Sequence, residues 1–229
     1  MYVEDKNKWT AVLAGVLAAG ISGQAAAQQT PADEAAAAKR LYMTKSCIAC
    51  HGKEGKKAIQ DYPDVAGQKA DYIAAQIKDI IDGKRTGSPD ASGNPRSKGM
   101  RGALVDPNGN RRISDEEISS IAKWLAAIEP RKPEAPATPL AEESKSRAAK
   151  LYAETCEACH GKTGREPLEG FPAIAGQKRA YVAAQMKDIK SKARRNGQSE
   201  AMQGAIAEMK DEDMELLADY VSQLDPGKP

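Results

Sequence analysis

Two short stretches of the chain, SCIACHGKEG at 46–55 and TCEACHGKTG at 155–164, contain all four of its cysteines and both of its histidines. In each stretch two residues separate the cysteines, and a histidine follows the second cysteine directly. The chain therefore places every thiol and every imidazole at two matched positions, which indicates two equivalent sites.

The regions around these stretches repeat as well. When the two motifs are aligned, 62–80 (YPDVAGQKADYIAAQIKDI) falls on 171–189 (FPAIAGQKRAYVAAQMKDI) without a gap. The repeat then continues at shorter offsets, so the first copy contains a longer loop, TGSPDASGNPRSKG at 86–99. Two copies are too few for a solenoid, and the pattern predicts a duplicated domain.

The expected domain boundaries follow from this repeat. The first domain is placed at 28–129 and the second at 145–229. Between them, 130–144 carries several prolines, which is typical of an extended, semi-rigid linker.

Hydrophobic spacing within each copy is helical, with no long alternation of period two. In the first copy three helices are expected, within 33–47, 69–83 and 114–128. Ser114 and Glu117 form a capping box at the start of the third helix, whereas Lys210 replaces the serine in the second copy. The sequence predicts an all-α protein with three main helices per copy.

The N-terminal segment, 1–27, has the order of features found in an export signal. A charged start is followed by an apolar run and then by small residues ending at Ala27, where cleavage is expected. A retained membrane anchor is the alternative, although the apolar run is shorter than the ~20 residues that span a bilayer. In both cases the functional part is expected outside the cytoplasm, and an uncleaved segment or a partner would hold it at a membrane.

The bulk composition excludes one class of function. A formal net charge of +2 over 229 residues gives no basis for nucleic-acid binding. Aromatic content is only 4%, with a single phenylalanine, so something besides aromatic side chains is expected to fill the two cores.

The C-x-x-C-H pattern is typical of covalent attachment of c-type haem. Two thiols about one helical turn apart can reach the two vinyl groups of a porphyrin, and the adjacent histidine can ligate its iron. The sequence therefore predicts two covalently bound haem c groups, held by Cys47, Cys50 and His51 in one copy and by Cys156, Cys159 and His160 in the other.

Two other roles of the cysteines, as a redox pair and as zinc ligands, fit the sequence less well. A thioredoxin-type redox pair belongs in a βαβ context and needs no histidine. A single zinc site would join cysteines from two separate copies of the repeat and leave both histidines unused.

The second axial ligand is expected to be methionine, because both histidines are already used. Of seven methionines, only Met100 and Met202 occupy the same place in both copies, in a segment expected to be a flexible loop. Core packing is the alternative role of any methionine. His/Met ligation fills both axial positions, which favours electron transfer over catalysis. A dihaem peroxidase, the competing enzyme, would need one axial position open or displaceable.

The two C-x-x-C-H stretches resemble those of class I c-type cytochromes. Together with MRGAL at 100–104 and MQGAI at 202–206, the long repeated phrases beginning at Tyr62 and Phe171 resemble the dihaem cytochrome c4 family, over about 34–226. The resemblance implies tandem cytochrome c domains, each wrapping one haem c, in a periplasmic electron carrier. Its expected partners are a quinol-oxidising complex (quinol–cytochrome c reductase) and a terminal oxidase.

The resemblance also implies roles for four further residues. The carbonyls of Pro63 and Pro172 would accept a hydrogen bond from the histidine rings, and Arg85 and Arg194 would face haem propionates. For the arginines, a solvated surface position is the alternative. The long loop at 86–99, the stretch DPNGNRR at 106–112 and the proline-rich linker depart from the family pattern. They leave the docking of the domains and the partner surface open.

A second functional class stays open beside the shuttle. The chain could be the fixed dihaem cytochrome subunit of an oxidoreductase, such as a sulfide, thiosulfate or alcohol dehydrogenase complex. A free species of monomer size would favour the shuttle, whereas a co-purifying dehydrogenase would favour the subunit.

Overall fold

The computed structural model describes Met1 and residues 30–89, 93–134 and 139–227. Apart from Met1, the expected export segment at 1–27 lies outside these residues, as do parts of the linker and of the long loop. No helix within the described residues is both long enough and apolar enough to cross a bilayer.

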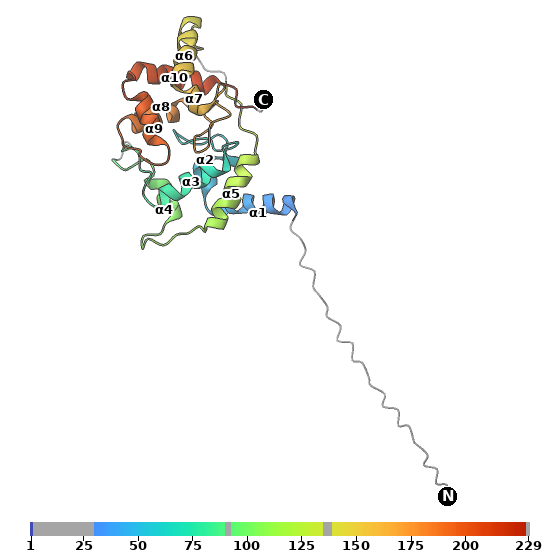
Figure 1. Ribbon diagram of the computed structural model, residues 1–229. Coiled ribbons are helices and arrows are strands. Elements are labelled where there is room, and N and C mark those ends of the chain that lie inside the picture. Colours follow the sequence, from blue (N-terminus) through green and yellow to red (C-terminus); the bar gives the residue numbers. More distant parts are fainter. Residues whose placement is uncertain (2–29, 90–92, 135–138, 228–229) are drawn as a thin grey trace.

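The described chain is helical and uses one arrangement twice, in two domains that lie against each other (Figure 1). The elements of the first domain are α1 (Pro31–Thr44), α2 (Cys47–His51), the 3-10 helix η1 (Lys53–Gly55), α3 (Ala70–Ile81), α4 (Lys98–Leu104) and α5 (Asp115–Ala127). Those of the second are α6 (Glu142–Thr155), α7 (Glu157–His160), α8 (Arg179–Lys190), α9 (Ser199–Ile206) and α10 (Asp211–Gln223). The described residues form two isolated β-bridges and no sheet, which confirms the predicted all-α class.

The last long helix organises each core. Helix α5 packs against α1 and α3, and α10 packs against α6 and α8. Tyr42 and Ile118 are fully buried in the first core, and Tyr152 and Met214 take the equivalent places in the second. Burying one such side chain stabilises a domain by about 1.5–3 kcal/mol, so these few large residues carry much of each small core.

The two copies begin their last helix differently. At α5 the Ser114 hydroxyl accepts from the Glu117 amide at 3.2 Å, and the Glu117 carboxylate accepts from the Ser114 amide at 2.9 Å. The predicted capping box is therefore formed. Lys210 makes no side-chain cap at α10. The first turn of α10 carries three acidic residues, whose negative charges interact favourably with the positive end of the helix dipole.

The repeated AGQK phrase joins the domains. Gln68 in the first domain donates to the Ala173 carbonyl at 2.9 Å and accepts from the Ala173 amide at 3.0 Å. Gln177, the equivalent residue of the second domain, donates to the Asp64 carbonyl at 2.8 Å and accepts from the Asp64 amide at 3.0 Å. Each glutamine thus pairs with the backbone of the other domain as a short piece of strand would, and the two contacts are related by the repeat.

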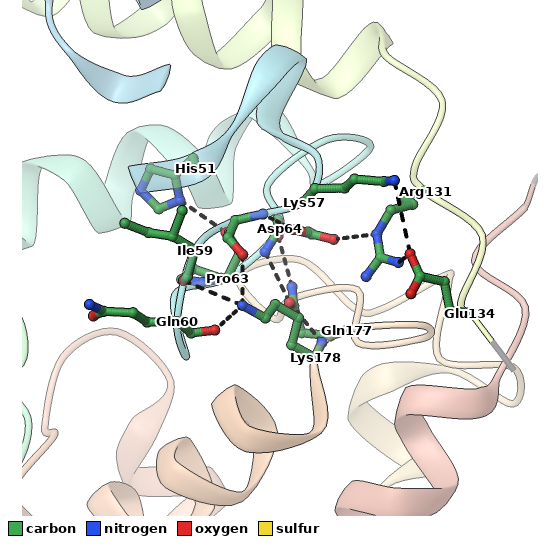
Figure 2. Close-up of polar contacts among 11 residues, drawn as sticks. His51, Lys57, Ile59, Gln60, Pro63, Asp64, Arg131, Glu134, Gln177 and Lys178 are labelled. Carbon is green, nitrogen blue, oxygen red and sulfur yellow. Dashed lines mark hydrogen bonds and ion pairs between the residues drawn. The ribbon is translucent and has the colours of Figure 1, made fainter. Parts of the chain in front are cut away.

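The lysine of the same phrase also reaches across. Lys178 extends from the second domain to the carbonyls around Ile59 in the first, including that of Ala58 at 2.8 Å (Figure 2). Lys69 makes the equivalent bond to the Pro167 carbonyl at 2.9 Å. Glutamine and lysine together form what we call the docking clamp: Gln68, Lys69, Gln177 and Lys178.

Two of the three segments that depart from the family pattern, the long loop and the linker, form contacts at or beside this interface. The Thr86 hydroxyl and the Gly87 amide both donate to the Ala193 carbonyl of the second domain, at 3.0 and 3.1 Å. At the start of the linker, Arg131 pairs with Asp64 at 3.0 Å, directly beside the clamp (Figure 2). The described ends of the loop and of the linker are therefore tied to the domains.

Replacing Ser114 by alanine should remove the capping box of α5. The expected loss is about 1 kcal/mol in the free energy of unfolding of the first domain. Urea unfolding followed through the fluorescence of Trp124, which lies on α5, measures it. Lys210→Ala is the matched control, because Lys210 makes no cap; equal effects of the two substitutions would contradict the assignment.

Replacing Gln177 by alanine should expose the Asp64 amide, which loses its acceptor in the other domain. Since a hydrogen bond contributes roughly 1 kcal/mol, hydrogen exchange of this amide should accelerate about fivefold. The Ala173 amide, held by Gln68, is the internal control and should change less. Unchanged exchange at Asp64 would show that the clamp does not hold in solution.

Candidate haem sites

The C-x-x-C-H residues form the short helices α2 and α7 in their domains. A tyrosine of the preceding long helix holds the end of each: the Tyr42 hydroxyl donates to the Gly52 carbonyl at 2.8 Å, and that of Tyr152 to the Gly161 carbonyl at 2.7 Å. Gly52 has a φ of +72°, and a Cβ there would lie 2.1 Å from the Lys56 carbonyl oxygen. The glycine after the motif is thus required for the chain to turn beneath the histidine.

Both histidine rings are oriented by a backbone carbonyl. The Nδ1–H of His51 donates to the Pro63 carbonyl and that of His160 to the Pro172 carbonyl, each at 2.9 Å. Burial lowers the pKa of both imidazoles, so they are neutral near pH 7. A neutral ring whose Nδ1 is occupied offers Nε2 as its free nitrogen, the form that binds a metal.

The four cysteines are free thiols that lie partly buried. Burial raises the pKa of Cys47 to about 11 and that of Cys156 to about 12, so both are protonated at neutral pH. Catalytic thiol pairs have lowered pKa values, so a thioredoxin-type role does not fit. Within the described residues the cysteines do not gather with other ligands into a metal cluster, which leaves the zinc alternative without a site.

A large apolar cavity lies between the motifs and spans both domains. Its free space is about 1460 Å³, part of it open to solvent, and it is lined by the first cysteine, the histidine and the repeat-matched methionine of each copy. An adjoining space of about 1210 Å³ reaches the rest of the first site, including Cys50. Cys159 lines neither space. Thiols at the edge, a neutral imidazole and a thioether around an apolar space fit a covalently attached porphyrin with a central iron.

The methionines reach this cavity from an unexpected element. Met100 lies on helix α4 and Met202 on helix α9, so the prediction of a flexible loop was wrong. Met43, by contrast, is 51% exposed on α1, away from the cavity. Helices place a thioether more reproducibly than a loop, because the backbone hydrogen bonds fix its position.

Among the other methionines, Met186 and Met214 are buried in the core of the second domain, as expected from their alignment with isoleucines. Met186 also lines the cavity, as its counterpart Ile77 does. The repeat-matched pair is therefore distinguished by its position in both copies and not by contact with the cavity alone.

The two predicted arginines meet at the domain interface. Arg85 donates to Gln76 of its own domain at 3.0 Å, and to Tyr181 and Gln185 of the second domain at 2.9 and 3.2 Å. Both arginines line the cavity. Arg194, only 8% exposed, makes the equivalent bonds to Gln185, Gln76 and Tyr72. The solvated-surface alternative is thus wrong for Arg194, and Arg85 is half-buried.

Sequence reasoning missed the polar residues that hold these arginines and the domains together. They are Tyr72, Gln76, Tyr181, Gln185 and the four residues of the docking clamp. All recur at equivalent positions of the two copies, so the signal was present. Repetition alone, however, does not tell whether a polar residue bonds within its own copy or across to the other.

Comparison with known proteins divides the chain into the same two domains. The cytochrome c family model matches twice, at 35–129 and 146–225. Cytochrome c4 of Stutzerimonas stutzeri is 32% identical over 78% of this chain and 84% of its own length. The crystal structure of reduced recombinant cytochrome c4 from Pseudomonas stutzeri superimposes with a TM-score of 0.66 at 29% identity, covering 83% of this chain and 98% of that one.

A further relative has a different name. The thiosulfate dehydrogenase electron acceptor of Stutzerimonas stutzeri strain A1501 is 27% identical over 93% of this chain and 94% of its own length. Both relatives are electron-transfer proteins by name.

The two matched domains, the two C-x-x-C-H helices and the cavity between them mean that the chain carries two covalently bound haem c groups and transfers electrons rather than catalysing a reaction. The chain belongs to the dihaem cytochrome c4 family.

Proposed function

We propose that this dihaem electron carrier works in the periplasm, taking electrons from a quinol-oxidising complex and passing them to a terminal oxidase. The single observation that carries the proposal is the matched pair of His51 with Met100 and His160 with Met202 around one cavity. Two closed ligand sets suit a protein that exchanges electrons with other proteins and binds no substrate at iron.

In this proposal the thiols of Cys47 and Cys50 hold one haem and those of Cys156 and Cys159 the other. Haem supplies one-electron exchange between ferric and ferrous iron. The chain's own residues do the rest: Pro63 and Pro172 fix the histidine rings through their carbonyls, which leaves Nε2 toward the cavity. An imidazole held in this orientation would need little rearrangement when the iron it ligates gains or loses an electron.

Arg85 and Arg194 are proposed to face the haem propionates. Both guanidinium groups lie in the adjoining spaces, and within the described residues they donate to tyrosine, glutamine and asparagine side chains. Two cations without a carboxylate among these contacts fit an anionic group brought in by the cofactor.

The proposed location rests on the sequence of 1–27, which has the features of a cleaved export signal. N-terminal sequencing of the protein isolated from cells tests it. A mature chain beginning just after Ala27 supports export with cleavage, and an intact Met1 would instead support the membrane anchor.

A second candidate partner is thiosulfate dehydrogenase, a member of the oxidoreductase class considered from the sequence. It is favoured by the near full-length similarity to a thiosulfate dehydrogenase electron acceptor. The relatives named cytochrome c4 favour the respiratory assignment instead, at somewhat higher identity but shorter coverage.

Stopped-flow reduction distinguishes the two partners. The oxidised holoprotein is mixed with quinol–cytochrome c reductase and quinol, or with thiosulfate dehydrogenase and thiosulfate, and reduction of both haems is followed by absorbance. Fast reduction in the first mixture and reoxidation by oxidase-containing membranes support the shuttle. Fast reduction only in the second, with co-purification of the dehydrogenase, would overturn it.

Replacing Met100 or Met202 by alanine should remove the sulfur ligand of one haem only. Each variant should lose about half of the sulfur-to-ferric-iron charge-transfer absorption and lower the potential of that haem, because thioether ligation raises it. Met43→Ala is the matched control, since Met43 is exposed on α1 and should change neither quantity. An unchanged spectrum in Met100→Ala or Met202→Ala would refute the ligand assignment, and a wild-type protein lacking this band at one haem would favour the peroxidase.

A further inference from the structure

Each haem motif has one exposed apolar neighbour at the same place in the repeat. Ile59 is 48% exposed, and Leu168, its counterpart in the second copy, is 58% exposed. The Ile59 amide donates to the Cys50 carbonyl at 3.0 Å, and the Leu168 amide donates to the Cys159 carbonyl at 3.0 Å. Both domains thus present a large apolar side chain beside their second motif cysteine.

The charges around this apolar residue differ sharply between the copies. Residues 45–60 contain four lysines and one glutamate, whereas the equivalent 154–169 contain two basic and four acidic residues. Two basic positions are common to both copies, and the difference lies mainly in four others. The first copy has Lys45, Ile48, Lys57 and Gln60 there, and the second has Glu154, Glu157, Glu166 and Glu169. We call these last four the acidic rim.

The acidic rim is available to a partner. Glu154, Glu166 and Glu169 are exposed and Glu157 is half-buried. Of the four rim glutamates, only Glu154 has an ion pair within the described residues. Its partner is Lys150 at 3.9 Å, and both side chains are largely exposed. Such a pair is worth little, so it leaves the Glu154 charge almost intact.

The compact fold of this segment keeps the rim together. The Gly161 amide donates to the Glu157 carbonyl at 2.9 Å, and a Cβ on Gly161 would lie 2.6 Å from the Glu166 carbonyl oxygen. The start of α7 and the following loop are therefore adjacent in space, with Leu168 in the same loop. One of the two common basic residues, Arg165, is turned toward the C-terminal residues by its bond to the Gly227 carbonyl.

The equivalent surface of the first domain has the opposite character. Lys57 lies 4.0 Å from Glu134, but the two side chains are 75% and 78% exposed, so this pair leaves the lysine charge almost intact. Figure 2 shows Arg131 close to the same glutamate, but Arg131 is already paired with Asp64 at 3.0 Å. Lys45 is the exception, since it pairs with Glu117 at 2.8 Å.

We propose that Leu168 and the acidic rim form the docking surface of the second domain for a redox protein with a basic docking face, and that the first domain does not bind this partner. An apolar centre with a charged rim is the usual anatomy of an interface. The rim charges set the association rate and reject partners of like sign, while the apolar centre slows dissociation. The two domains therefore serve chemically different partners, and electrons that enter through one leave through the other.

This inference rests on the two-haem electron carrier but not on which complex supplies its electrons. It would hold for the quinol-oxidising complex and for thiosulfate dehydrogenase alike. Its test therefore uses neither of them.

The probe is a small, strongly basic redox protein, mitochondrial cytochrome c, added to the reduced full-length holoprotein. Amide shift changes are mapped by NMR at low ionic strength, and the electron-exchange rate is followed against salt. Two variants with the same change in net charge are compared: Glu166→Gln/Glu169→Gln in the second domain and Glu54→Gln/Glu129→Gln in the first. All four side chains are exposed or half-exposed, so both variants should keep the wild-type haem spectrum.

The shifts should concentrate at 154–169, and the second-domain variant should slow association about three- to tenfold with a weaker salt dependence. The first-domain variant should bind no more slowly than the wild type. Leu168→Ala should speed dissociation with little effect on the salt dependence. Shifts centred on Ile59, equal slowing by both variants, or salt-independent exchange would each overturn the proposal.

Discussion

The hydrogen bond from each histidine Nδ1–H to a proline carbonyl farther along the chain ties the two parts of the molecule together. In the first domain the acceptor is Pro63, and the next residue, Asp64, pairs through its amide and carbonyl with Gln177 of the second domain. In the second domain Pro172 and Ala173 repeat the arrangement with Gln68. One loop therefore orients the imidazole and docks the domains. Separating the domains would release the segment that fixes the histidine ring. The geometry of each haem site therefore depends on the docking of both domains.

Most contacts at the interface occur twice, once from each copy of the repeat. One buried carboxylate is an exception, because its contact is present in only one copy. Asp79 accepts from Asn196 of the second domain at 2.8 Å. The residue equivalent to Asn196 in the first domain is Gly87, which has no side chain to offer Asp188. Asp188 is 2% exposed, and its Oδ2 has no hydrogen-bond partner among the residues that the structure describes. Arg96 of the inserted loop approaches it only to 3.8 Å. Asp188 lines the space beside the first site, so this break in the repeat gives the two sites different electrostatic surroundings. Such charges tune the potential of a nearby iron, so this break in symmetry would make the two haem potentials unequal.

The sequence predicted the features whose physics is local. The capping box at Ser114 and the three long helices of each copy depend on residues a few positions apart, and the structure contains them. The methionine segment was mispredicted because its glycines suggested a loop, whereas Gly102 and Gly204 lie inside α4 and α9. The docking clamp could not be predicted, since a glutamine that pairs with a distant backbone leaves no spacing signal in its own neighbourhood.

Duplication explains why the two domains fit together, and later divergence explains why their surroundings differ. The clamp and the arginine network occur in both copies, and each residue bonds to the copy opposite, so one surface had to be compatible with its own duplicate. Positions outside that surface were free of this constraint. The copies differ in the buried carboxylate environment at Asp188 and in the charge around Leu168. The first difference would affect the driving force between the haems, and the second is the proposed basis for the choice of partner. Asymmetry in both respects would give a symmetric scaffold a direction for electron flow.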